Sequence, residues 1–261
     1  MPTMRDFYAN TSPAPLDQAQ GLRRLFAGKR QRFIPLAANP HVAFSGVLLD
    51  HVSAALAARG HRVLVVDAAD RSPAPHEMAL LDLGSCIENL SPQIGYLAGR
   101  GLPLAHVDTR GSASGFLDAL AQAAPKADAI VLHANAGDLA RLFMRRSARP
   151  ILMGADHPES IKHAYAACKL LAQRCSLMTF DLLLAADPAS RRVPNIAASV
   201  AGCADGFLGA VLHDWAVIDP AAGPADAIDT ALDRLLAAQM TLVDDGLPRA
   251  AAPAVYAHAS N

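Results

Sequence analysis

The chain has 261 residues, of which 52% are hydrophobic and 18% charged, and its formal net charge is −1 at pH 7. A chain of this size can bury one large core, so we expect a single α/β domain with tails. Its near-neutral charge gives no general attraction to nucleic acid or to an acidic bilayer, so we expect no nucleic-acid partner and at most weak membrane contact.

The predicted elements begin after a lead of residues 1–15, which we expect to be flexible because it ends in a polar, proline-rich stretch. A helix is predicted from residue 16 to residue 27, where Asp17 and Gln20 have the spacing of a capping box. Five cations fall within ten residues: Arg23, Arg24, Lys29, Arg30 and Arg32. Such a run is typical of a solvent-facing surface, so residues 16–32 are predicted to be a basic helix and linker.

Residues 33–67 have the pattern of a β-α-β unit. In a P-loop enzyme, the turn of such a unit holds nucleotide phosphates with several glycines, a lysine, and a serine or threonine that reaches Mg²⁺. Here the turn runs from Asn39 to Gly46 with a single glycine, and no lysine or arginine lies between Phe33 and Arg59. We therefore predict a nucleotide-binding architecture in which neither ATP nor Mg²⁺ is a cofactor.

The rest of the chain alternates short apolar strands with helices. Strands are predicted at 103–108, 128–133, 150–154, 177–185, 206–212 and 216–218. Helical segments are predicted at 76–83, 93–98, 114–123, 138–147, 158–174, 195–202 and 226–242. This alternation is typical of a mostly parallel, doubly wound sheet with helices on both faces. Residues 33–246 are the predicted α/β domain, and residues 247–261 are predicted to be a disordered tail.

The last predicted helix could lie on a membrane or pack against the sheet. Its polar positions carry Asp226, Asp229 and Asp233 against a single Arg234. Because this balance disfavours an anionic bilayer, we expect the helix to pack against the sheet.

The four cysteines are scattered without a C-x-x-C pair, and the N-terminus has no apolar signal segment. We expect reduced thiols and a cytoplasmic location. The ten histidines form no metal-ligand motif, and no hydrolase motif occurs. We predict no catalytic residue and no metal ligand, and leave open whether His133 and His157 form a ligand site at the ends of neighbouring strands.

Four segments together resemble the FlhG-type flagellar number regulators, a branch of the MinD/ParA-like deviant P-loop ATPases. The strongest matches are residues 17–25 and residues 55–68, which read DQAQGLRRL and ALAARGHRVLVVDA. A third lies between Pro158 and Leu171, and a weaker fourth consists of Phe207-Leu208-Gly209 and Asp219. The resemblance implies a MinD/ParA-like P-loop NTPase fold over most of residues 16–220.

The resemblance also implies a partner. In the family, the N-terminal helix binds the signal-recognition-type GTPase FlhF and stimulates its GTP hydrolysis, with a glutamine that assists at the active site. Gln18 is the matching residue, and the implied partner-binding set is Asp17, Gln18, Gly21, Leu22, Arg23 and Arg24. The expected role is a bacterial cytoplasmic regulator of flagellar number or placement that can be recruited to the cell pole. Flagellar transcription or switch components and a second copy of the chain are further expected partners.

Matching the family's motifs without gaps implies a degenerate nucleotide site. The family's signature lysine falls on Pro40, its second lysine on Ser45 and its Mg²⁺-binding threonine on Gly46. With Asn39 and His41, these positions form the altered loop.

The implied switch positions are altered as well. Asp67 keeps the first-switch aspartate, but its partner position is Ala69, unless Asp70 replaces it, and the second-switch aspartate falls on His133. Because catalysis of phosphoryl transfer is almost entirely positioning and charge stabilisation, these losses predict a pseudo-ATPase.

Two alternatives stay open. An active ATPase or anion-binding enzyme could use a rebuilt loop, with Ser45 capping the helix and Arg71, Arg110 or Lys162 replacing the lysines. Alternatively, the chain is a structural dimer partner of an intact paralogue.

Overall fold

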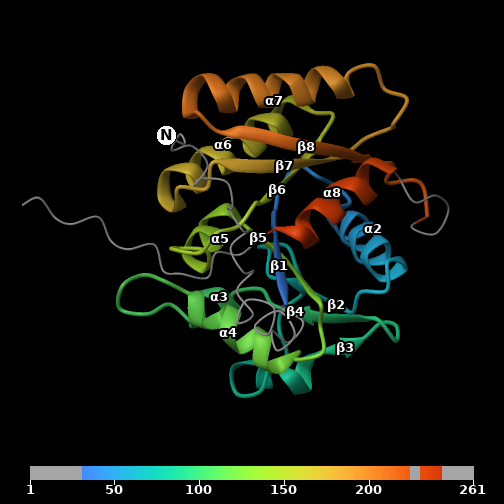
Figure 1. The fold of residues 1–261 in the computed structure, drawn as a ribbon. Helices are drawn as coiled ribbons and strands as arrows, with labels where there is room; N and C mark the ends of the chain where they lie inside the picture. The colour runs from blue at the N-terminus through green and yellow to red at the C-terminus, as the bar shows by residue number, and fades with distance from the viewer. Residues whose placement is uncertain (1–30, 224–229, 243–261) are drawn as a thin grey trace, which may run out of the picture. The chain divides into compact units, whose positions relative to one another are not determined.

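The computed structural model describes residues 31–223 and 230–242. Within them, one sheet has the strand order β3-β4-β2-β5-β1-β6-β7-β8 (Figure 1). The strands are β1 (Arg32–Ala37), β2 (Val63–Asp67), β3 (Glu88–Asn89), β4 (Ile94–Ala98), β5 (Ala129–Ala134), β6 (Ile151–Ala155), β7 (Thr179–Ala185) and β8 (Val211–Ile218). Only the β3–β4 pair among these strands is antiparallel. The predicted mostly parallel α/β fold is confirmed.

Helices cover both faces of this sheet (Figure 1). One face carries α2 (Ser45–Ala58) and α8 (Thr230–Thr241). The other carries α3 (Leu102–Ala105), α4 (Ser114–Ala123), α5 (Ala136–Leu142), α6 (Pro158–Cys175) and α7 (Val193–Leu208). Two short 3-10 turns, η1 (Glu77–Leu80) and η2 (Gly84–Cys86), follow β2.

The central strand β5 shows why the apolar runs of this sequence form strands. All six of its residues are buried. Because successive side chains of a strand point to opposite faces, Ile130 and Leu132 pack under α4 and α5 while Val131 packs under α2. A strand covered on both faces needs an unbroken apolar run, and this is the pattern of residues 129–132.

Two predicted segments in the middle of the chain are wrong. Residues 93–98, predicted to be helical, contain β4, whose residues pair in parallel register with β2. Residues 103–108, predicted to be a strand, begin with α3 instead. Gly101 precedes α3 with a φ of 79°, and Pro103 lies in its first turn, where the missing N–H costs no helical hydrogen bond.

The predicted strand at 206–212 is also wrong. Helix α7 continues to Leu208, and Gly209 ends it with a φ of 63°. β8 begins only at Val211. Glycine adopts this left-handed conformation without steric cost and commonly ends helices, so the Gly209 signal was present in the sequence.

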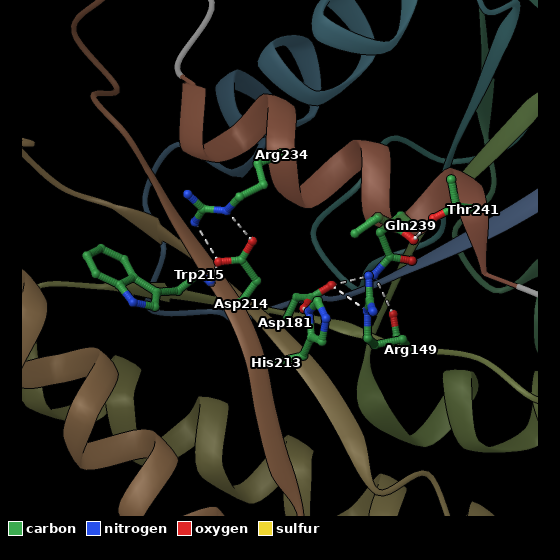
Figure 2. A network of polar contacts seen from close by, with 9 residues as sticks. Arg149, Asp181, His213, Asp214, Trp215, Arg234, Gln239 and Thr241 are labelled. Carbon is green, nitrogen blue, oxygen red and sulfur yellow. Dashed lines mark hydrogen bonds and ion pairs between the residues drawn. The ribbon is translucent and has the colours of Figure 1, made fainter.

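α8 packs against the sheet, as predicted, through the buried Leu232, Leu235 and Leu236. A buried polar network adds to this contact (Figure 2). Gln239 of α8 donates from Nε2 to Asp181 Oδ2 at 2.7 Å and to the carbonyl oxygen of Arg149 at 2.8 Å. Among the described residues, the structure contains no helix with the length and apolar character needed to cross a bilayer.

The carboxyl group at the centre of this network, that of Asp181, has a raised pKa. Asp181 on β7 is fully buried, and Arg149 Nε donates to its Oδ2 at 2.8 Å. Burial raises the pKa of Asp181 although the guanidinium of Arg149 opposes the change. At the rim, Arg234 of α8 makes two hydrogen bonds to Asp214, of 2.9 and 2.7 Å (Figure 2).

Candidate functional site

The carboxyl ends of β1, β2 and β5 meet at one edge of the sheet, where open α/β folds place their ligands. Asp67 ends β2 and lies opposite His133 of β5 in the strand register. The loop from β1 to α2 lies beside them and carries Asn39, Pro40 and His41. The structure therefore brings the predicted loop and switch positions together.

The β1–α2 loop is held by hydrogen bonds to its own protein. Asn39 is only 4% exposed, and its Nδ2 donates at 2.8 Å to the carbonyl oxygens of Met153 and Ser160 and at 3.0 Å to Ser160 Oγ. Its Oδ1 accepts from the backbone N–H of His41 at 3.0 Å. The amide of Asn39 thus faces inward and fixes the loop to β6 and α6.

The start of α2 lacks a side-chain cap. Phe44 is the N-cap residue and makes no capping hydrogen bond, and no acidic residue lies in the first turn. Ser45 is the first helical residue, so the expectation that Ser45 caps the helix is wrong. The position of Gly46 has room for a side chain, because a Cβ added there would meet no atom within 4 Å.

Asp67 and His133 form a direct pair. His133 Nδ1 lies 2.7 Å from Asp67 Oδ1, and the His133 ring is almost completely buried. The Ser72 hydroxyl donates to the same carboxylate oxygen, and the Tyr96 hydroxyl donates to Oδ2 at 3.5 Å. The carboxylate therefore accepts hydrogen bonds from three side chains.

These contacts keep Asp67 ionised. Burial opposes ionisation, but hydrogen bonds from His133 and Ser72 and the charge of His133 outweigh it, so the pKa of Asp67 is lowered. Burial and the nearby Asp67 charge raise the pKa of Tyr96 to about 12. An ionised carboxylate can only accept, so we assign the Nδ1 proton to His133.

The cations proposed as lysine substitutes differ in position. Arg71 donates from Nη1 to the carbonyl oxygen of Pro40 at 2.9 Å and lines the cavity beside the loop. Lys162 is exposed and pairs with Glu159 at 2.7 Å, and neither it nor Arg110 lines that cavity. Asp70, the possible replacement at the first-switch position, accepts a hydrogen bond from Asn135 Nδ2 at 3.0 Å.

The cavity itself has a volume of about 170 Å³. Pockets for drug-sized ligands usually occupy about 300–1,000 Å³. Asn39, Ser45, Asp70, Arg71, His133 and His163 line it together with five further residues, and Arg71 is the one lysine or arginine among these described lining residues. The cavity is therefore small and poor in cations.

The hypothesis that His133 and His157 share a site is not supported, because His133 bonds to Asp67 instead. His157 stacks on His41 with ring centroids 6.3 Å apart and accepts from the N–H of Glu159 at 3.3 Å, which caps α6. His163 packs edge-on against His41, and burial followed by the charge of His41 lowers its pKa. Within the part of the chain that the structure describes, no three His, Cys, Asp or Glu side chains are arranged to hold a metal ion.

Sequence reasoning missed four side chains of this site: Ser72, Tyr96, Ser160 and His163. Tyr96 lies in a segment predicted to be helical, and Ser72 follows β2 in a loop for which no contact is predicted. Ser160 belongs to the family-like segment after Pro158, which was the available signal. The expected partner-binding residues Asp17, Gln18, Gly21, Leu22, Arg23 and Arg24 lie outside the described residues.

The sequence matches no protein-family model and no curated protein. Its structure is similar to the MinD cell division protein of Aquifex aeolicus, with 12% identity, a TM-score of 0.53, and coverage of 79% of this chain and 97% of that one. The MinC:MinD complex of the same organism matches with 13% identity and a TM-score of 0.55, covering 79% of this chain and 96% of that one. Cobyrinic acid a,c-diamide synthase of Mycobacterium smegmatis matches with 17% identity and a TM-score of 0.54, covering 79% of this chain and 94% of that one.

At these low identities the comparison establishes the fold alone. Combined with the strand order and the two helical layers, it shows that the chain has a MinD/ParA-like α/β fold.

Proposed function

We propose that this protein is a FlhG-like pseudo-ATPase scaffold that regulates flagellar number or placement by stimulating a FlhF-type GTPase. The MinD/ParA-like fold supports the general architecture. The specific partner rests on the family-like segment of residues 17–25. The body of the protein would position this segment, and the chemistry would occur in the partner.

The observation that carries the pseudo-ATPase part is the chemistry of the crevice. A triphosphate with Mg²⁺ needs fixed cations, backbone donors and a metal-binding hydroxyl. The β1–α2 loop offers Pro40 and Gly46 at the matching positions, and Asn39 already anchors the loop internally. His133 stands where a switch carboxylate would, and it is paired with Asp67.

The N-terminal segment supplies the expected activity. Arg23 and Arg24 would make charge-assisted hydrogen bonds to acidic groups of the GTPase, and Gln18 would enter its active site. This is the same division of labour by which an activating protein contributes one side chain to another protein's phosphoryl-transfer site.

GTP turnover by a FlhF-type GTPase, measured with and without the full chain, tests the partner. We expect stimulation by the natural chain, a large loss with Gln18→Ala, and full stimulation with Gln93→Ala, which truncates an exposed glutamine on the body. Absence of stimulation by the natural chain, or equal stimulation by Gln18→Ala, would contradict the proposal.

Thermal melting with ATP and Mg²⁺ tests the pseudo-ATPase part separately. A ligand present at 100 times its Kd stabilises a protein by about 2.7 kcal/mol. We expect no change of Tm at millimolar ATP with Mg²⁺. A clear increase of Tm would show that the crevice still binds nucleotide.

A further inference from the structure

Another cavity lies at the amino ends of β2 and β4, at the edge of the sheet opposite the β1–α2 loop. Its volume of about 520 Å³ is within the range of about 300–1,000 Å³ that is usual for small-molecule sites. Its walls come from the start of β2, the turn before β4 and the loop between α4 and β5. Because β2 pairs in parallel with both β4 and β5, the amino ends of these strands meet there.

Part of the cavity wall is apolar and tightly packed from behind. Leu64, Ile87 and Ile94 line the cavity, and Ile87 and Ile94 are only partly buried. Gly95 lies against this wall, since a Cβ added there would be 3.1 Å from Ile87 Cγ2 and 3.6 Å from Leu64 Cδ1. The protein therefore presents a preformed apolar surface to the cavity, as is usual for small-molecule sites.

Among the described lining residues there are two cations and no acidic side chain. Arg62 and Lys126 are both exposed, and neither side chain makes an ion pair within the described part of the chain. The backbone brings them to the same corner, because the carbonyl oxygen of Arg62 accepts from the N–H of Asp128 at 2.7 Å. The carboxylate of Asp128 is buried and accepts from the backbone N–H of Arg62 at 2.9 Å. Neither Asp128 nor Glu88 lines the cavity.

Further hydrogen-bond donors come from β3 and the turn before β4. Asn89 and Gln93 line the cavity, and their side-chain amides make no hydrogen bond to the described residues. Ser91 also lines it, and its Oγ accepts from the N–H groups of Gln93 at 3.3 Å and Ile94 at 3.1 Å. These side chains therefore add donors to a cavity that already has two cations.

This combination indicates the chemistry of a ligand. An excess of cations and donors without a carboxylate favours a negatively charged molecule. Arginine forms bidentate hydrogen bonds with phosphate and carboxylate groups, and lysine adds a point charge. An inorganic anion would leave the apolar wall exposed to water, whereas the body of an organic anion would cover it.

We propose that this cavity binds a small organic anion, which carries one phosphate or carboxylate group on an apolar body. The anionic group binds at Arg62 and Lys126, and the apolar body covers Ile87 and Ile94. The site is separate from the crevice beside the β1–α2 loop, because the two cavities share none of their described lining residues.

This inference goes beyond the proposed function and does not depend on it. It rests on the amino edge of the sheet, whereas stimulation of a GTPase rests on residues 17–24. The two proposals can therefore fail separately.

Nuclear magnetic resonance of the isotope-labelled full chain, titrated with phenyl phosphate and with benzoate, tests the site. We expect binding at millimolar concentration, with changes in the backbone N–H signals of Gly84, Gly95 and Ala127. Inorganic phosphate, acetate and phenol carry the anionic group or the ring alone. Each should bind at least about tenfold more weakly, because it lacks either the charge or the apolar area. The better of phenyl phosphate and benzoate identifies the preferred anionic group.

Two variants locate the anionic group. Arg62→Gln and Lys126→Gln each remove one positive charge from an exposed side chain, so both should fold. We expect each to weaken the binding of phenyl phosphate or benzoate by about tenfold, since hydrogen bonds between charged groups are the strong ones. Arg110→Gln is the matched control, because Arg110 is an exposed cation that does not line the cavity, and it should leave binding unchanged.

Three results would overturn the proposal. The first is no change in the N–H signals with either organic anion at millimolar concentration. The second is equal affinity for the organic and the inorganic anions, which would show only an exposed basic surface. The third is unchanged binding in both Arg62→Gln and Lys126→Gln.

Discussion

At the carboxyl end of the sheet, Asp67 accepts hydrogen bonds from His133, Ser72 and Tyr96, and its pKa is lowered. At the amino end, Asp181 accepts from Arg149 and Gln239, yet its pKa is raised. The guanidinium beside Asp181 is a stronger partner than an imidazole, so the partner alone does not decide the direction. Burial is the largest raising effect at both carboxylates; the hydrogen bonds and charge at Asp67 outweigh it, whereas those at the fully buried Asp181 do not.

The comparison shows two uses of a buried carboxylate in one sheet. At the amino end, the polar network joins Gln239 of α8 to Asp181 and Arg149 (Figure 2). At the carboxyl end, the network joins the ends of β2 and β5 through Asp67 and His133, and His133 also lines the cavity beside the β1–α2 loop. The network around Asp181 therefore holds a helix on the sheet, whereas the network around Asp67 joins neighbouring strands beside a cavity.

Breaking the amino-end pair should have the largest effect. Arg149→Met leaves the buried Asp181 without its cation, and removing one partner of a buried ion pair costs about 3–5 kcal/mol. We expect a decrease of this size in the free energy of unfolding, measured in urea. The control is Arg146→Met, which breaks the exposed pair with Asp118 and should cost about 0–1 kcal/mol. Equal losses in the two variants would show that Asp181 is not buried as described.

At the carboxyl end, Asn39→Ala should cost about 1–3 kcal/mol, because it removes the buried hydrogen bonds from the Asn39 amide to the carbonyl oxygens of Met153 and Ser160. Urea unfolding measures the loss, and hydrogen exchange of residues 38–44 should increase as the loop is released. Asn195→Ala on the exposed surface of α7 is the control and should be close to neutral. Unchanged exchange in Asn39→Ala would contradict the anchoring role of the amide.

The two carboxylates should respond to acid with opposite sign. The lowered pKa of Asp67 gives stability that is present above the usual aspartate pKa and is lost as pH falls through the folded value. The raised pKa of Asp181 gives stability that is present below the usual pKa and is lost as pH rises through the folded value.

Urea unfolding at several pH values separates the two contributions. Asp67→Asn should weaken the loss of stability in acid, and Asp181→Asn should weaken the loss above the usual aspartate range. A tenfold difference in proton affinity between folded and unfolded chains corresponds to about 1.4 kcal/mol, which sets the scale of both effects. Pronounced changes of the same sign in both variants would contradict the distinction between the two ends.

The smallest predicted effect concerns the uncapped start of α2. Ser45→Asp adds a carboxylate where helix N–H groups are unpaired and should raise the free energy of unfolding by about 0.3–1 kcal/mol. Ala58→Asp places the same group at the other end of α2 and should be destabilising. Thermal melting at low ionic strength compares them. A loss of stability in Ser45→Asp would show that the α2 terminus does not attract negative charge.

Much of the fold could be predicted because the central strands are buried on both faces. An apolar run such as residues 129–132 favours a strand that is buried on both faces, and the predicted helix at 114–123 has the bounds of α4. Near the sheet edge the signal weakens. β4 contains Gly95, and its outer neighbour is the two-residue strand β3. Its short apolar run therefore resembles a helical turn in the sequence.

The sequence predicts where the site lies, but it does not predict which side chains of the site bond to one another. The turn at Asn39 and the strand ends at Asp67 and His133 follow from the β-α-β pattern and from the register of parallel strands. The bond between Asp67 and His133 depends on which strands are neighbours, and the sequence order does not reveal that β5 lies next to β2. The inward turn of the Asn39 amide depends likewise on the approach of α6 to that loop.

The anchoring of Asn39 has a consequence for partner binding. A loop that changes position must replace its buried hydrogen bonds with others, because buried polar groups without partners are costly. The amide of Asn39 bonds to both β6 and α6, so we expect the β1–α2 loop to keep one conformation when the protein meets a partner.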